Sequence, residues 1–272
     1  MTRIAVVGGG RIGEALIAGL LESGRAAKDL VVVENLAPRA AQLAERFKIR
    51  VSGSVADAVV GADIVVIAVK PTVVDSVLTD LSKSDLDNGR DQVLVSLAAG
   101  VSTSRLESKL PAGFPVVRVM PNTPMLVGQG MCVQAPGRYA KSEQLEQVGE
   151  MLEAVGKVVT VPESQMDAVT AVSGSGPAYF FLVVEAMVDA GVGLGLTREV
   201  ANELVVQTMI GASALLDETG QSAVDLRAAV TSPAGTTAAA LRELERGALR
   251  STFAEALHAA KQRAHEQGGS GE

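Results

Sequence analysis

The feature that most constrains this chain is an alternation, from residue 4 to about residue 161, of short β-branched runs with amphipathic stretches. Strands that alternate with helical segments build a parallel sheet with crossover helices. The runs are apolar throughout, as expected of strands that helices cover on both faces. We therefore predict a Rossmann-type α/β domain with strands at Ile4–Val7, Leu30–Val33, Ile64–Val69, Val93–Leu97, Val116–Val119 and Val158–Val161.

After Pro162 the pattern changes to long helical stretches without strand-like alternation. We predict a boundary there, with residues 1–162 forming the sheet domain and residues 163–272 an all-α domain. A chain of 272 residues is long enough for two separate cores. We expect the polar end, Gln267 to Glu272, to be mobile. The predicted helices are Ser164–Val172, Pro177–Val192, Arg198–Leu216, Val224–Val230 and Thr236–Gln267.

Composition and charge exclude several classes of function. A net charge of −7 provides no basic field for phosphate backbones, so we expect no nucleic-acid partner. Cys132 is the only cysteine, which excludes an intrachain disulfide and a cysteine-built metal site. We expect Cys132 to be a core residue, and we predict no metal site.

Two further observations favour a cytoplasmic protein with no membrane partner. The first predicted strand begins at Ile4, which leaves no room for a targeting leader. The most apolar helical stretch, Ala178–Leu196, is interrupted by Glu185 and Asp189, so a buried helix is a better interpretation than a bilayer span.

The helical part has more apolar surface than one narrow stripe. This surplus favours burial against another subunit and hence a homo-oligomer, although an internal bundle could cover the same surface. The surplus is clearest at Val200, Ala201, Leu204, Val205, Met209, Ile210 and Leu215.

A glycine motif follows the first predicted strand. Gly8, Gly10 and Gly13 form G-x-G-x-x-G at the start of a predicted helix, Ile12–Leu21. The first glycine makes the turn, the second lets a pyrophosphate approach the backbone, and the third lets the helix pack on the strand. The helix N-terminus then faces the anion. The motif predicts binding of a nicotinamide dinucleotide.

The end of the second strand leaves the choice between NADH and NADPH open. Glu34 lies where an acidic side chain accepts hydrogen bonds from the ribose hydroxyls of NADH and repels a 2′-phosphate. Arg39 could instead pair with the phosphate of NADPH, and a solvated loop pair is the third interpretation.

Two other strand ends belong to the same predicted crevice, namely Ala68–Pro71 and Ser96–Gly100. Ligands lie at the carboxyl ends of parallel strands. The small residues 98–100 would let a ribose or nicotinamide approach closely. A simple tight turn is the alternative, but the position favours binding.

Two segments rich in small and hydroxyl residues precede helices in the second part of the chain, Ser173–Tyr179 and Thr231–Thr237. Hydroxyls and free backbone N–H groups at a helix start can hold a carboxylate. Helix capping alone would also explain either segment.

Taken together, six motifs resemble those of pyrroline-5-carboxylate reductases over about residues 2–266. The segment 231–237, followed by Ala238–Leu241, is similar to that family's signature and is more specific than the glycine motif. The six motifs are Gly8–Gly13, Val69–Pro71, Arg118–Pro124, Ser173–Tyr179, Asp189–Gly191 and Thr231–Thr237.

The resemblance implies reduction of 1-pyrroline-5-carboxylate to L-proline, the last step of proline biosynthesis, by hydride from NADH or NADPH. It also implies that backbone amides around Gly235, Thr236 and Thr237, with Ser232 beside them, hold the substrate carboxylate. The Thr237 hydroxyl would donate or relay a proton to the ring nitrogen, as the catalytic group. Glu163 is similar to the family's substrate-side acid, although a helix N-terminal charge is an equal interpretation.

The resemblance further implies a homodimer that can assemble into a decamer, with helical dimerisation domains interlocked and the active site near the dimer interface. Together with the glycine motif and Glu34, it gives the predicted cofactor residues Val7, Gly8, Gly9, Gly10, Arg11, Ile12, Gly13, Glu34, Ala68, Val69, Lys70, Pro71, Leu97, Ala98 and Ala99.

Three positions depart from the family pattern. Ala234 replaces a usual glycine, which is harmless only if φ there stays negative. Val55 replaces an Asn that touches the adenosine ribose, so that contact is lost or moved to Ser54. Glu34 replaces small polar residues, which weakens any assumption that NADPH is preferred.

Two other functions are less consistent with the residues of this chain. A β-hydroxyacid dehydrogenase would carry a helix-borne lysine, but no lysine lies between Lys157 and Lys261. A nucleotide-sensing scaffold without turnover would have a damaged substrate loop, whereas Ser232, Pro233 and Gly235 are present.

Overall fold

The computed structural model describes residues 2–84, 86 and 91–269. They group into two compact units, one comprising residues up to Ser175 together with those from Ala260 onward, and the other Gly176–Ala259. The bounds of these two units do not coincide with the predicted domain boundary at residue 162. That boundary stays a prediction. Residues 163–175 belong with the first unit because Met166 is buried against Val133 and Ala135.

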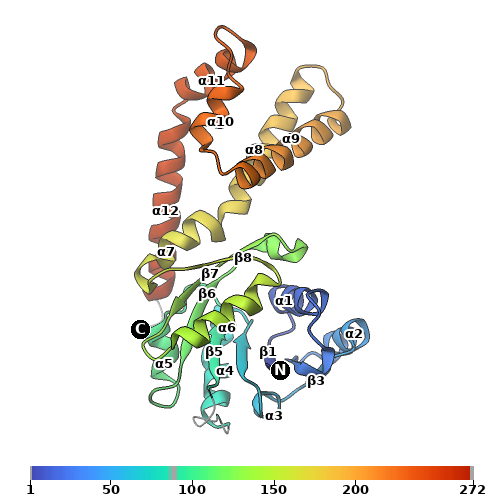
Figure 1. The fold of residues 1–272 in the computed structure, drawn as a ribbon, viewed down its shortest axis with the longest axis vertical. Coiled ribbons are helices and arrows are strands. Elements are labelled where there is room, and N and C mark those ends of the chain that lie inside the picture. The colour runs from blue at the N-terminus through green and yellow to red at the C-terminus, as the bar shows by residue number, and fades with distance from the viewer. Residues whose placement is uncertain (1, 85, 87–90, 270–272) are drawn as a thin grey trace. The chain divides into compact units, whose positions relative to one another are not determined.

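An eight-stranded sheet forms the centre of the first unit (Figure 1). Its strands are β1 (Ile4–Val7), β2 (Leu30–Val33), β3 (Arg50–Ser52), β4 (Ile64–Ile67), β5 (Val93–Ser96), β6 (Val116–Met120), β7 (Gly130–Pro136) and β8 (Gly156–Thr160). Their order is β3-β2-β1-β4-β5-β6-β7-β8. The predicted α/β fold is confirmed, with two strands, β3 and β7, that the sequence pattern did not indicate.

The predicted parallel sheet contains one antiparallel pair, because β7, a strand that was not predicted, runs antiparallel to β6. Only a short 3₁₀ segment, η3 (Thr123–Val127), lies between these strands. A parallel return requires a crossover of a dozen or more residues, so this connection can only reverse the chain. β7 escaped prediction because it contains Gln134 and has no long β-branched run.

Helices cover both faces of the sheet, as the apolar strands predicted. Alternate β1 residues point to opposite sides: Ile4 and Val6 belong to one core cluster, and Ala5 and Val7 to the other. The first cluster includes side chains of α1 (Arg11–Glu22), α2 (Ala37–Phe47) and α6 (Ser142–Glu153). The second includes side chains of α3 (Val55–Val59), α4 (Val74–Ser82) and α5 (Thr103–Ser108).

Strand register brings four strand ends to one edge of the sheet. Val7 pairs with Val33 and with Ile67, and Ile67 pairs with Ser96. Backbone hydrogen bonds continue just past these ends, from Gly8 N to the Val33 carbonyl, from Ala68 N to the Val7 carbonyl and from Leu97 N to the Ile67 carbonyl. The segments that follow β1, β2, β4 and β5 are thereby held side by side.

The predicted helix Ser164–Val172 is instead a composite of three short pieces. These are the 3₁₀ turn η4 (Glu163–Gln165), α7 (Met166–Val169) and the π-helical η5 (Thr170–Gly174). The widened turn is closed by a bond from Ser175 N to the Thr170 carbonyl at 2.8 Å. Asn122 holds the same turn through a bond from Nδ2 to the Ser173 carbonyl at 3.0 Å.

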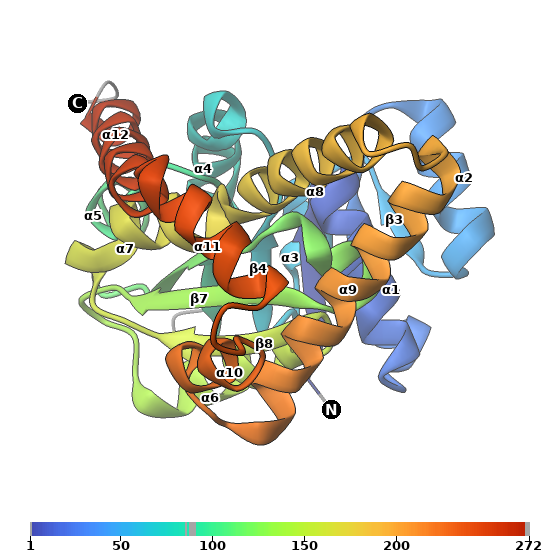
Figure 2. The same ribbon diagram turned by 90° about the horizontal axis from the view of Figure 1, so that it is seen from above.

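The second unit is helical, as predicted, and contains α8 (Gly176–Gly193), α9 (Arg198–Thr219), α10 (Ala223–Ala229), α11 (Thr236–Arg246) and the first part of α12 (Leu249–Gly269). Helices α8 and α9 contact each other and diverge from the turn that joins them (Figure 2). The helical stretch predicted for Thr236–Gln267 is divided into two helices, because Gly247 ends α11 and Ala248 adopts a positive φ of 56°.

The predicted mobile end is partly wrong as well. Residues Gln267–Gly269 continue α12, where Gln267 and Gly268 pack near Gly100 within the first unit. The remaining residues, 270–272, lie outside the described part of the chain.

The surplus apolar surface is visible on α8 and α9. Phe180, Phe181, Leu204 and Ile210 are each more than half exposed in the single chain. The helical run Glu163–Gly193, with mean hydropathy 1.4, also has the length and composition of a membrane-crossing segment, a test that helices of soluble proteins pass too.

Candidate functional site

A cavity of about 740 Å³ lies at the sheet edge where β1, β2, β4 and β5 end. Every predicted cofactor residue except Gly13 lines it, namely Val7, Gly8, Gly9, Gly10, Arg11, Ile12, Glu34, Ala68, Val69, Lys70, Pro71, Leu97, Ala98 and Ala99. The strand register explains why residues so far apart in sequence meet there.

The three glycines of the motif have different surroundings at this edge of the sheet. Gly8 has φ of 114°, and a Cβ there would lie 2.6 Å from the Ala68 carbonyl oxygen. A Cβ on Gly13 would overlap the Gly8 carbonyl oxygen, so α1 can approach β1 only without a side chain at this position. A Cβ on Gly10 would meet no atom within 4 Å, which leaves open space beside the backbone.

Helix α1 directs free amides toward this space. Gly10 is its N-cap, and Glu14 N makes the bond to the Gly10 carbonyl at 2.8 Å. The N–H groups of residues 11–13 precede that bond and have no acceptor within the helix. Together with the positive end of the helix dipole, they suit a pyrophosphate. The cavity therefore offers a dinucleotide open space beside the backbone and free amide donors for its phosphates.

Glu34 and Arg39 do not share this cavity. Glu34 lines it, and its Oε1 accepts a hydrogen bond from Leu36 N at 2.9 Å. Arg39 is not among the lining residues; its Nε donates to the Gly9 carbonyl at 2.9 Å and its guanidinium pairs with Glu14.

Val55, where the family resemblance implies an Asn, lines the cavity with an apolar side chain. The Ser54 hydroxyl accepts from Asp57 N at 3.2 Å and so caps α3, and Ser54 is absent from the cavity wall.

Sequence reasoning missed one wall of the cavity. Val73, Ser76, Val77 and Asp80 line it from α4 and the residue before it. Their spacing follows one helical face directly after Lys70 and Pro71, so this periodicity could have indicated them. Val33, Asn35 and Leu36 were also missed.

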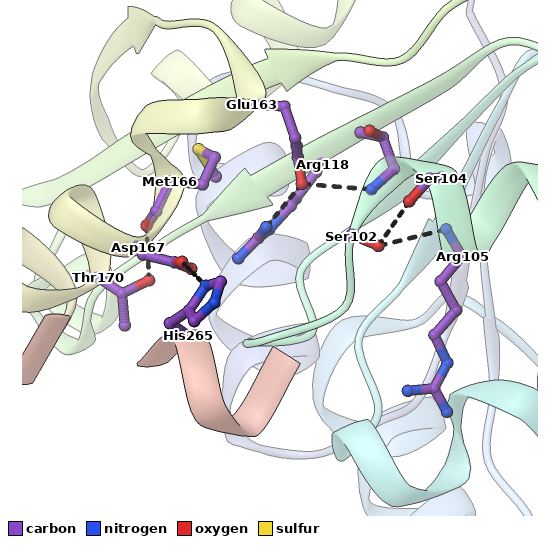
Figure 3. Close-up of polar contacts among 10 residues, drawn as sticks. Ser102, Ser104, Arg105, Arg118, Glu163, Met166, Asp167, Thr170 and His265 are labelled. Carbon is purple, nitrogen blue, oxygen red and sulfur yellow. Dashed lines mark hydrogen bonds and ion pairs between the residues drawn. The ribbon is translucent and has the colours of Figure 1, made fainter. Parts of the chain in front are cut away.

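Glu163 forms hydrogen bonds with residues of β6 and α5 (Figure 3). Its Oε1 accepts from Arg118 Nη1 at 2.7 Å and from Thr103 N at 3.3 Å. The Arg118 side chain is only 6% exposed and that of Glu163 30% exposed, so this ion pair is shielded from water. Oε2 of Glu163 is buried and has no hydrogen-bond partner within the described residues. The carboxylate thus keeps one acceptor available.

The segment Thr231–Thr237 forms a turn that leads into α11. The Gly235 N–H donates to the Ser232 carbonyl at 3.0 Å, and the first helical bond runs from Ala239 N to the Gly235 carbonyl at 3.1 Å. The amides of residues 236–238 are therefore the ones left without helical acceptors. Unlike the amides of Thr236 and Thr237, that of Gly235 already has a partner.

Ala234 does not keep the negative φ that would make its replacement of a glycine harmless, because its φ is 59°. An L-residue with a Cβ is strained in this left-handed region, where glycine is not.

The described residues contain no group of three or more His, Cys, Asp or Glu that could hold a metal ion. Burial raises the pKa of the Cys132 thiol to about 11, so Cys132 is protonated at neutral pH and is a poor nucleophile.

Two family models match the chain. Residues 163–267 match the model described as pyrroline-5-carboxylate reductase dimerisation, and residues 3–100 match that described as NADP oxidoreductase coenzyme F420-dependent. Among relatives, the pyrroline-5-carboxylate reductase of Mycobacterium leprae is 56% identical, with 98% of this chain and 97% of that protein covered.

Solved structures agree along the whole chain. A pyrroline-5-carboxylate reductase from Coxiella burnetii superposes with a TM-score of 0.94 at 36% identity, covering 98% of both chains. The Plasmodium falciparum pyrroline carboxylate reductase, solved with NADP bound, gives 0.85 at 29% identity and the same coverage.

The strained residue gives a stability prediction. Replacing Ala234 by glycine should raise the free energy of unfolding by about 0.5–1 kcal/mol, because removing the left-handed strain outweighs the added freedom of the unfolded chain. Ala239→Gly, within α11, is the matched control and should lower it by about 1 kcal/mol. Urea denaturation at fixed protein concentration measures both. A loss of stability in Ala234→Gly would contradict the left-handed conformation at this residue.

Proposed function

The chain belongs to the pyrroline-5-carboxylate reductase family, and from that premise we propose that it reduces 1-pyrroline-5-carboxylate to L-proline with hydride from NADH or NADPH. The observation that carries the proposal is the cavity at the sheet edge, which gathers Gly8, Gly10, Glu34, Lys70 and Ala98 in one place. When bound, the nicotinamide cofactor supplies the hydride.

The protein's own contribution to the chemistry is mainly positioning. The ring carbon of a protonated cyclic imine is already electrophilic, so strong acid or base groups are unnecessary. The α1 amides would hold the pyrophosphate, and the small residues Ala98 and Ala99 would let the nicotinamide end approach the backbone.

On the substrate side, we assign the carboxylate to the amides of Thr236 and Thr237, with Ser232 and the turn at Gly235 beside them. These amides precede the first bond of α11 and are free to donate. The Thr237 hydroxyl would donate or relay a proton to the ring nitrogen, with water returning a proton to the hydroxyl. Glu163 would act through Oε2, the carboxylate atom that Arg118 and Thr103 do not occupy.

For the cofactor, we propose that NADH is preferred. Glu34 lines the cavity at the end of β2, where its carboxylate suits ribose hydroxyls and repels a 2′-phosphate. Arg39, the cation that could have reversed this choice, is engaged by Gly9 and Glu14.

We also propose a cytoplasmic homodimer in which the exposed apolar side chains of α8 and α9, such as Phe180 and Ile210, pack against a second copy. Assembly of such dimers into a decamer is the further expectation from the family resemblance. Nucleic acid and membrane are not proposed as partners.

The proposed reaction has a direct test. Purified protein mixed with 1-pyrroline-5-carboxylate should oxidise NADH, seen as a fall in nicotinamide absorbance, and should form proline, identified by chromatography. A reaction without substrate is the control. The proposal fails if neither NADH nor NADPH is oxidised.

The proposed proton donor can be tested separately. Thr237→Ala should lower kcat by about a hundredfold, the size of a typical general-acid contribution, while the KM for cofactor changes less than about twofold. Thr252→Ala, which removes a hydroxyl bonded to the Ala248 carbonyl, is the matched control and should keep the wild-type kcat. An unchanged kcat in Thr237→Ala would remove this role from the hydroxyl.

Cofactor preference depends in this proposal on Glu34. The wild type should have a higher kcat/KM with NADH, and Glu34→Ser should raise kcat/KM for NADPH about tenfold relative to NADH by removing the repulsive charge. Glu22→Ser, an exposed change at the end of α1, is the control. If the ratio in Glu34→Ser equals that of the wild type, Glu34 does not select the cofactor.

A further inference from the structure

Arg39 is held beside the cofactor cavity by contacts that use all its side-chain nitrogens. Nε donates to the Gly9 carbonyl at 2.9 Å, Nη1 to Gln42 Oε1 at 3.4 Å, and Nη2 to Glu14. The side chain is 28% exposed, so most of it is withdrawn from solvent. The Gly9 peptide lines the cavity, whereas Arg39 lines a neighbouring hollow with Glu14, Gln42 and Arg46.

Glu14 is the residue that fixes this arrangement. It follows the last glycine of the motif, in the first turn of α1, and its side chain is 20% exposed. Oε2 pairs with Arg39 and Oε1 pairs with Arg46 at 2.6 Å. The Arg46 guanidinium also lies 4.9 Å from the centre of the Phe47 ring, and it is largely exposed. The Glu14 carboxylate thus holds two guanidinium groups in the neighbouring hollow, outside the cofactor cavity.

We infer that Glu14 is a positioning residue for cofactor choice, because it holds the Arg39 guanidinium out of the cavity and leaves Glu34 there instead. The inference rests on the proposed binding of a nicotinamide dinucleotide in this cavity. Arg39 donates to the carbonyl of Gly9, a residue that lines the cavity. A guanidinium released from Glu14 would be close enough to pair with a 2′-phosphate, a group for which its planar donors are well suited.

The choice between the two dinucleotides therefore depends on a competition for one cation. In the wild type the Glu14 carboxylate occupies Nη2 of Arg39, one of the donors that a 2′-phosphate would need. Replacing Glu14 by glutamine keeps the size of the side chain and removes its charge, so the phosphate becomes the stronger partner. An unmodified ribose gains nothing from this change.

Binding of two small nucleotides tests the inference without turnover. Calorimetric titration with 2′,5′-ADP and with 5′-AMP measures the contribution of the 2′-phosphate to binding, because the two nucleotides differ only in that group. Glu14→Gln should lower the Kd for 2′,5′-ADP about tenfold and change the Kd for 5′-AMP less than about twofold. The double variant Glu14→Gln with Arg39→Gln should lose this gain. Arg46→Gln, which removes the other partner of Glu14, is the matched control and should not tighten 2′,5′-ADP binding.

Kinetics give a second readout that a merely structural role would not move. In Glu14→Gln the KM for NADPH should fall about tenfold while the KM for NADH and both kcat values stay near wild type. An unchanged Kd for 2′,5′-ADP in a variant that still binds 5′-AMP would overturn the role of Glu14 and leave the cofactor cavity standing. A wild type that binds neither nucleotide would instead contradict the proposed cavity itself.

Discussion

The hydrogen-bonded register of the parallel strands is the constraint on which the rest of the structure depends. It places Val7, Val33, Ile67 and Ser96 at one edge, so that the residues after them surround a single cavity. A shift of one strand by one residue would exchange the side chains that face the two cores and displace the residues after that strand from the cavity. Because helices bury both faces of the sheet, the register that fills the core is also the register that builds the site.

Close backbone contact between α1 and the turn after β1 determines where the α1 N-terminus and the Glu14 side chain lie. Gly13 lets α1 lie directly on the turn after β1, which brings the helix N-terminus and its free amides to the cavity. The same contact places Glu14 one residue further along, within reach of Arg39 on α2. Packing and electrostatics are therefore coupled here. Gly13, which permits the close approach of α1, also positions the Glu14 carboxylate, and we infer that this carboxylate weakens binding of a 2′-phosphate.

The helical unit is governed by a different constraint, namely apolar surface that one chain leaves exposed on α8 and α9. Burial of such surface stabilises a subunit interface, in agreement with the description of the family model that matches residues 163–267. Within this unit the turn before α11 tolerates Ala234 in a left-handed conformation. That strain lies in the segment to which we assign substrate binding, where backbone strain is commonly found.

The sequence by itself indicated the α/β class and the change to helices after Pro162, because β-branched runs and helical periodicity are local signals. The glycine motif, Glu34 and the family resemblance together indicated fourteen of the cavity's lining residues. Tertiary structure decided what local signals cannot carry. The antiparallel β7, the break at Gly247 and the positive φ of Ala234 depend on connection length and packing. The sequence also left the choice between NADH and NADPH open at Glu34 and Arg39. Only the fold brought Glu14 to Arg39, 25 residues away along the chain, whereas Glu34 lines the cavity.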